Sequence, residues 1–149
     1  MGENCMKYYT TRDSNETKQK GSEFAANLRG GEVLCLYGDL GSGKTVFVSG
    51  IINFFLKEKR VLSPTFTIVR HYPVQSRKIT DIYHADLYRI TNENEIIGLG
   101  LTEIFGKKGV FLAIEWAQNL GKFIPDRRIN ITFKIINGNE REIKEEWIR

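Results

Sequence analysis

One eight-residue stretch constrains the fold of this chain more than any other: Gly38-Asp39-Leu40-Gly41-Ser42-Gly43-Lys44-Thr45. It matches the phosphate-loop pattern G-x-x-x-x-G-K-[ST]. Glycines let the backbone curl so that several N–H groups point inward, and the N-terminus of the next helix adds partial positive charge. Together they form a nest for phosphate oxygens, so the stretch predicts a nucleotide site in an α/β fold.

The flanking sequence has the pattern that such a loop requires. The apolar run 33–37 predicts a buried strand before it, and a helix is expected from Lys44 to about residue 57. We expect all of Gly38 to Val46 to belong to the nucleotide site, with Lys44 at the β- and γ-phosphates of ATP and the Thr45 hydroxyl on Mg²⁺. A glycine-rich turn that only leads into a helix is disfavoured, because Lys44 and Thr45 both stand in register.

Length and composition favour a single domain over residues 1–149. The chain is 41% hydrophobic and 27% charged, and at this size a domain buries about 68–70% of its unfolded surface without disulfides. Apolar runs stay well short of the roughly 20 residues that a membrane helix needs, and the first residues lack signal-peptide features, so we expect a cytoplasmic protein with no membrane association. The two cysteines have no C-x-x-C spacing, which disfavours a metal or redox role.

The net charge of +4 is weak support for nucleic-acid binding. Positive and negative residues alternate, and no run of five or six like charges appears. An ATP site needs cations of its own, and a solvated surface accounts for the rest. Composition therefore gives little support for direct contact with a nucleic acid.

Two acidic residues are candidates for the chemistry of phosphoryl transfer, in which the protein positions groups and neutralises charge. Glu115 ends the apolar run 110–114, as the acid of a Walker B strand does beside a phosphate loop. Asp86 lies in a second strand candidate, where His84 is expected on the same face, either as its hydrogen-bond partner or as a structural residue. Glu115, Asp86 and Thr45 are all candidate Mg²⁺ ligands, and Glu115 is alternatively placed to orient the attacking water.

Two further residues have a functional and a structural interpretation. Trp116 either packs at the nucleotide or fills the core. Thr65, next to Pro64, either contacts the γ-phosphate or Mg²⁺ as a switch threonine or simply forms a turn.

The remaining sequence predicts helices and two hairpins. Asp13 and Glu16 form a capping box for a helix to about Leu28, and Phe54 is expected to face the sheet from the helix after the loop. Strands are expected at 66–72 with 79–88, helical turns at 92–97 and 101–105, and a C-terminal β-hairpin of 129–136 with 141–148 around Asn137-Gly138.

Four motifs in this order resemble the bacterial TsaE proteins, the small ATPases of tRNA threonylcarbamoyladenosine biosynthesis. Gly38–Thr45 is similar to the family's G-D-L-G-A-G-K-T loop, and Ser63-Pro64-Thr65-Phe66-Thr67 to its S-P-T-[FY]-T segment. His84-Ala85-Asp86-Leu87-Tyr88-Arg89 resembles H-x-D-L-Y-R, and Glu115-Trp116 resembles E-W. The loop alone fits thousands of ATPases, whereas all four motifs together are specific.

The resemblance implies a P-loop NTPase fold with a mixed central sheet flanked by helices, and ATP hydrolysis that supports a complex of TsaB and TsaD. It assigns Lys44 and Thr45 to phosphate and Mg²⁺, Glu115 to Mg²⁺, and Asp86 to hydrolysis. Trp116 is placed at the nucleotide or the partner, and Thr17 near the nucleotide.

Some positions depart from the family pattern. Ser42 replaces alanine and Val46 replaces a frequent threonine, which the backbone contacts of the loop should tolerate. Arg70-His71 stand where an acidic residue is common, which puts partner contacts there in doubt.

Two functions of other classes stay open at this point. A small P-loop kinase acting on a nucleoside or metabolite uses the same loop, but it normally needs a lid with several arginines, and 149 residues leave little room for one. A nucleotide-switched binding module with little turnover is the other, and the paired acids Asp86 and Glu115 argue against it.

Overall fold

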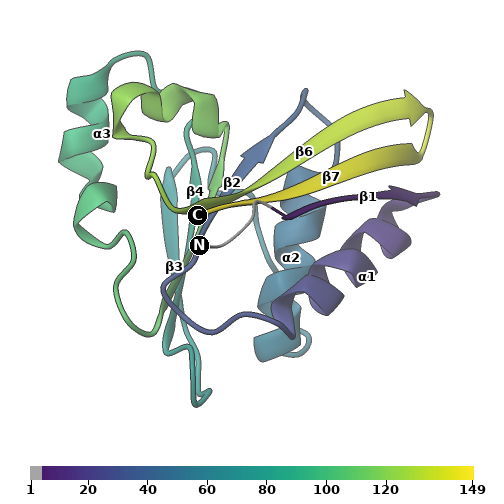
Figure 1. The fold of residues 1–149 in the computed structure, drawn as a ribbon, viewed down its shortest axis with the longest axis horizontal. Coiled ribbons are helices and arrows are strands. Elements are labelled where there is room, and N and C mark those ends of the chain that lie inside the picture. Colours follow the sequence, from purple (N-terminus) through teal and green to yellow (C-terminus); the bar gives the residue numbers. More distant parts are fainter. Residues whose placement is uncertain (1–4) are drawn as a thin grey trace.

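The computed structural model describes residues 5–149, which form a mixed seven-stranded sheet flanked by helices (Figure 1). The strand order is β1-β7-β6-β2-β5-β4-β3. Strands β6, β2, β5 and β4 run parallel, and the outer strands β3, β7 and β1 are antiparallel to their neighbours. The predicted α/β fold with a mixed sheet and a C-terminal hairpin is confirmed. The strands are β1 Cys5–Thr11, β2 Val33–Tyr37, β3 Val69–Pro73, β4 Asp81–Asp86, β5 Val110–Glu115, β6 Arg128–Asn137 and β7 Glu140–Ile148.

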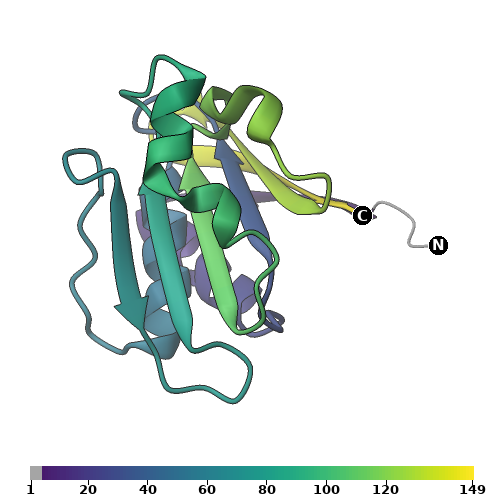
Figure 2. The same ribbon diagram turned by 90° about the vertical axis from the view of Figure 1, so that its left-hand side faces the viewer.

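Helices cover both faces of the sheet (Figures 1 and 2). On one face lie α1 (Ser14–Ala25) and α2 (Lys44–Phe55), and on the other lie α3 (Glu93–Leu99) and the short 3₁₀ segments at Leu101–Glu103 and Ala117–Phe123. No helix among residues 5–149 is both long enough and apolar enough to cross a membrane.

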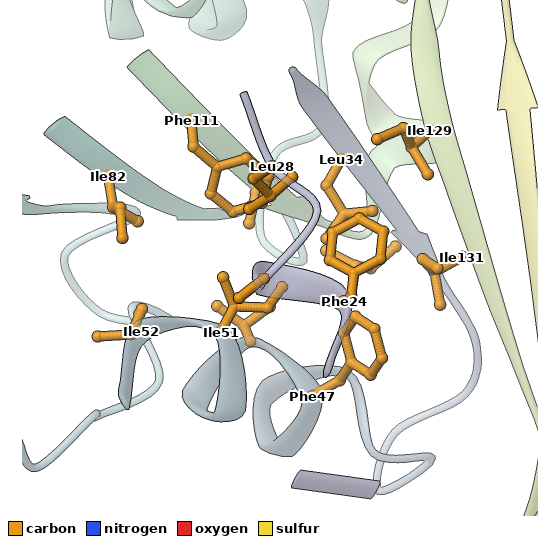
Figure 3. Packing of buried hydrophobic residues seen from close by; sticks show 14 of the residues in the cluster. Phe24, Leu28, Leu34, Phe47, Ile51, Ile52, Ile82, Phe111, Ile129 and Ile131 are labelled. Atoms are coloured by element: carbon orange, nitrogen blue, oxygen red, sulfur yellow. The ribbon is translucent and has the colours of Figure 1, made fainter. Parts of the chain in front are cut away.

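Alternating side chains of the central strands divide the core into two clusters. On β2, Leu34 and Leu36 join the cluster under α1 and α2, while Val33 and Cys35 join the one under α3. In the larger cluster the rings of Phe24 and Phe47 pack with centroids 5.6 Å apart (Figure 3). Burial of the central strands on both faces explains why they read as continuous apolar runs in the sequence.

Glycines bring α1 and α2 unusually close together. A Cβ atom on Gly21 would lie 2.1 Å from the carbonyl oxygen of Phe47, and one on Gly50 would lie 2.0 Å from that of Lys18. Gly21 therefore lowers helix propensity within α1 but permits the contact that fixes α1 against α2.

The structure differs from the sequence predictions mainly at the ends of elements. Strand β1 was not predicted, because it is an exposed edge strand without an apolar alternation. The α1 helix ends at Ala25 rather than near Leu28, and Phe54 is 43% exposed rather than facing the sheet. The Asp13 carboxylate caps the Glu16 N–H at 2.9 Å as expected, but the Glu16 carboxylate accepts from the Arg12 N–H instead of completing the capping box.

Candidate nucleotide site

The phosphate loop connects β2 to α2 and is held open by three glycines. Gly38, Gly41 and Gly43 have φ angles of 145°, 74° and 110°, which only glycine adopts without strain. Gly43 is the N-cap of α2 and offers no side-chain oxygen to the first turn. The amino end of the helix therefore faces the pocket and suits an anion.

Lys44 folds back onto the loop from the first turn of α2. Its Nζ donates to the carbonyl oxygens of Gly38 and Asp39, the latter at 2.8 Å, and to Ser42 Oγ at 3.4 Å. The ammonium also lies 4.6 Å from the centre of the Trp116 ring. Burial lowers the pKa of Lys44, and the carboxylates of Glu115, Asp86 and Asp39 oppose that shift. The site thus places an ammonium group inside the loop, where it suits an anionic ligand.

Glu115 lies at the end of β5, directly beside the start of α2. Its carboxylate is buried and accepts a hydrogen bond from Thr45 Oγ1, which lies 2.9 Å from each of its two oxygens. His84 Nε2 lies 2.6 Å from Glu115 Oε2. Of the two interpretations left open for His84, the hydrogen bond to Asp86 is not the one that forms. Although His84 and Asp86 share a face of β4, the imidazole reaches across to the neighbouring strand.

Asp86 ends β4, directly opposite Glu115 in the parallel pairing of β4 and β5. Its Oδ1 accepts from the Tyr88 N–H at 2.9 Å and its Oδ2 from Thr65 Oγ1 at 3.0 Å. Thr65 in turn lies 2.6 Å from Ser63 Oγ. The turn around Pro64 therefore brings two hydroxyl groups to the acid edge of the site, where a switch threonine would act.

Strained backbone borders the two acids. Trp116 has a φ of 56° immediately after Glu115, and Ile68, whose carbonyl accepts from the Asp86 N–H at 2.8 Å, has a φ of 66°. Such angles are rare for residues with a Cβ and unfavourable for a β-branched one, and they concentrate at functional sites. Trp116 packs its ring 4.9 Å from that of Tyr88, at the mouth of the pocket.

Arg141, on β7, supports the loop from a point a hundred residues further along the chain. Its Nε donates to the Ser42 carbonyl and its Nη2 to the Gly41 carbonyl, both at 3.1 Å. Phe133 of β6 lies behind the loop, where its β-carbon would contact a Cβ on Gly38 at 3.1 Å. Sequence reasoning missed both residues, because their roles depend on where the hairpin lies in space and no local pattern marks it.

The predicted site residues fall into two groups. The pocket itself has a volume of about 210 Å³ and is lined by Leu40, Gly41, Ser42, Gly43, Lys44, Thr45, Val46, Ser63, Thr65, Asp86, Glu115 and Trp116. Gly38, Asp39 and Thr17 are not among the residues that line it. The Thr17 hydroxyl is 2.7 Å from Thr11 Oγ1, and its methyl group would lie 3.4 Å from a Cβ on Gly43. Thr17 therefore packs against the loop, and its place near the nucleotide stays a prediction.

The donor set fits Mg²⁺ bound together with a phosphate ligand. Within residues 5–149, no group of three or more His, Cys, Asp or Glu side chains could hold a metal ion by itself. Mg²⁺ seldom needs one, because it usually takes one or two carboxylates and completes its shell with water and substrate phosphates. Thr45, Glu115 and Asp86 supply hard oxygen atoms beside a loop suited to those phosphates.

The family model described as "Threonylcarbamoyl adenosine biosynthesis protein TsaE" matches residues 11–143. The chain belongs to the TsaE family. The match spans every site residue named above, from Thr17 to Arg141.

Individual TsaE proteins resemble the chain over nearly its whole length. The TsaE of Bacillus subtilis (strain 168) is 39% identical over 91% of this chain and 82% of its own. The TsaE of Rickettsia typhi is 36% identical over 93% and 94% respectively. Among solved structures, the crystal structure of Bacillus subtilis YdiB superposes with a TM-score of 0.79 at 32% identity, over all of this chain and 90% of that one.

Proposed function

We propose that this chain is a Mg²⁺-dependent ATPase that supports the TsaB–TsaD complex in threonylcarbamoyladenosine modification of tRNA. The observation that carries the proposal is the meeting of the phosphate loop with two carboxylates at the ends of adjacent parallel strands, Asp86 and Glu115. The family model and the relatives' names, which refer to threonylcarbamoyladenosine biosynthesis, support the pathway. In this proposal tRNA is reached through the partner proteins.

Hydrolysis forms a bond from a water oxygen to the γ-phosphorus and breaks the bond to the bridging oxygen, releasing ADP, phosphate and a proton. Lys44 neutralises negative charge on the phosphates, as do the N–H groups of the loop and the first turn of α2. Asp86, fixed by Thr65 and the Tyr88 N–H, orients the water and accepts its hydrogen bond. Thr45 and Glu115 are the groups that would hold Mg²⁺, which when bound screens the phosphate charge.

The mouth of the pocket supports dependence on partners. Phe66 is 83% exposed, with the Arg89 guanidinium 4.7 Å from its ring centre, and Leu40 and Tyr88 are also exposed. Exposed apolar side chains gathered beside a polar site are typical of surfaces that another protein covers. We therefore expect slow turnover by the isolated chain and faster turnover in the complex.

The test is phosphate release from Mg·ATP by the purified chain, alone and with TsaB and TsaD. Asp86→Ala is the diagnostic variant, and Asp81→Ala, at the other end of β4, is its matched control. We expect the partners to stimulate release, and only Asp86→Ala to abolish it. Phosphate that instead appears on an added nucleoside or metabolite would establish a kinase, and nucleotide binding without turnover in either condition would establish a switched binding module.

A further inference from the structure

A buried histidine lies beside the site and has no role in the mechanism described so far. His84 is fully buried on β4, and its Nε2 lies 2.6 Å from Glu115 Oε2. Its Nδ1 is also buried and has no hydrogen-bond partner within residues 5–149. A buried polar atom without a partner is costly, so its presence calls for a functional explanation.

The strand register explains how the imidazole reaches Glu115. His84 stands opposite Ala113 in the parallel pairing of β4 and β5, and Asp86 stands opposite Glu115. Residues two apart on a strand face the same way, so all four lie on one face of the sheet. This is the face that α1 and α2 cover, since Ala113 belongs to the core cluster beneath those helices. Ala113 has the smallest side chain with a Cβ, which leaves space for the ring to extend across the neighbouring strand.

The hydrogen-bond chemistry fixes the direction of this contact. An ionised carboxylate only accepts, so the His84 Nε2 carries the hydrogen. A ring that donates from Nε2 alone leaves a lone pair at Nδ1, whereas a second N–H there would be a buried donor without an acceptor. His84 therefore donates its single ring N–H to Glu115.

We propose that His84 is a positioning residue that acts through Glu115. The carboxylate receives one hydrogen bond from His84 and one from Thr45, which come from different elements and fix its orientation toward the loop. Partners of metal-binding carboxylates orient the ligand in this way, and their loss typically costs about 10- to 100-fold in metal affinity or activity. The inference rests on the proposed function, because it needs Glu115 to serve Mg²⁺.

The experiment measures binding of a fluorescent ATP analogue as Mg²⁺ is titrated, with thermal unfolding of the nucleotide-free protein as a second readout. Three variants are compared: His84→Leu removes the donor, His84→Gln keeps a side-chain N–H donor, and Ile82→Ala loosens the same face of the same strand without touching the site. His84→Leu is expected to raise the Mg²⁺ concentration needed for half-maximal binding of the analogue, the Mg²⁺ midpoint, about 10- to 100-fold. The affinity for the analogue in EDTA should not change. The unfolding temperature of His84→Leu should fall no further than that of Ile82→Ala, so that general destabilisation does not account for the shift.

Recovery of the Mg²⁺ midpoint in His84→Gln, and an unchanged midpoint in Ile82→Ala despite its lower unfolding temperature, would support the proposal. So would the absence of any further effect of His84→Leu in a Glu115→Gln background. An unchanged midpoint in His84→Leu, equal impairment of the Leu and Gln variants, or an equal shift in Ile82→Ala would overturn it. Failure of the proposed function is distinguishable, because the unsubstituted protein would then show no Mg²⁺-dependent binding or turnover.

Discussion

The two sides of the nucleotide pocket are held in place in different ways. The loop side is supported from outside the local sequence, by Arg141 on the carbonyls of Gly41 and Ser42 and by Phe133 behind the glycines. The acid side is supported within the sheet and the turn before β3, by His84 on Glu115 and by Thr65 on Asp86. Under the proposed function this difference implies two separable roles: the loop side sets how tightly phosphate is bound, and the acid side sets Mg²⁺ binding and hydrolysis.

Replacement of Lys44 by Ala should have the largest effect, which is a loss of affinity for ATP. The substitution removes charge-assisted hydrogen bonds worth about 1.5–3 kcal/mol each, so affinity for ATP should fall about 100-fold or more. Isothermal titration with Mg·ATP measures the change. Unaltered affinity for ATP in Lys44→Ala would show that the loop side does not determine phosphate binding.

Replacement of Asp86 by Ala should instead lower the rate of ATP turnover. Loss of a group that orients the attacking water and accepts its hydrogen bond should lower the rate about 10²- to 10⁴-fold, while affinity for ATP should stay within about threefold because the loop is untouched. Single-turnover phosphate release and titration, run on the same preparation, separate the two quantities. If Asp86→Ala and Lys44→Ala lost affinity equally, the division between the two sides would be wrong.

Replacement of Arg141 by Leu tests whether support from β7 belongs to the loop side. Two hydrogen bonds to loop carbonyls are lost, and with about 0.5–1.5 kcal/mol for each we expect affinity to fall about 5- to 100-fold, with little change in the rate of the bound complex. The matched control is Arg127→Leu, immediately before the amino end of β6, which should leave ATP affinity unchanged. A selective loss of turnover in Arg141→Leu would instead couple the hairpin to the acid side.

The smallest effect is expected at Asp81, at the end of β4 away from the pocket. Hydrogen bonds from Thr80 and His71 lower the pKa of Asp81 below its ordinary value of 3.8. A lowered folded-state pKa means that the contribution to stability is present above pH 3.8 and is lost as pH falls through the folded-state pKa.

Asp81→Asn should therefore reduce the free energy of unfolding by about 1 kcal/mol or less near neutral pH, and the difference from the unsubstituted protein should vanish in acid. Urea melts at several pH values measure it. ATP affinity and turnover should not change, and a change in either would show that the site extends along β4.

On both the loop side and the acid side, the sequence predicted the features that local patterns mark. The glycine loop and the apolar strand that ends at Glu115 are local patterns, and both appear where the residues indicated. The C-terminal hairpin was predicted because Asn137-Gly138 is a strong turn signal. These features depend on neighbours in the chain.

What the sequence did not predict depends on distant pairing. The hydrogen bond from His84 goes to Glu115 because β4 lies beside β5, whereas Asp86 was the only possible partner predicted from the sequence. Arg141 reaches the loop only because β6 adds to β2 in parallel and so carries the hairpin turn past it. Strand β1 forms because β7 offers it an edge, and its own sequence gives little sign of this.

The strand order has a consequence for synthesis on the ribosome. Strand β1 is synthesised before the other strands of the sheet, yet its hydrogen-bonding neighbour is β7, the last of them in the sequence. The loop likewise lacks the guanidinium that fixes Gly41 and Ser42 until residue 141 has left the exit tunnel. A nascent chain that already contains the whole phosphate-loop motif therefore still lacks the Arg141 contacts, and under the proposed function full affinity for nucleotide should appear only after β7 has been synthesised.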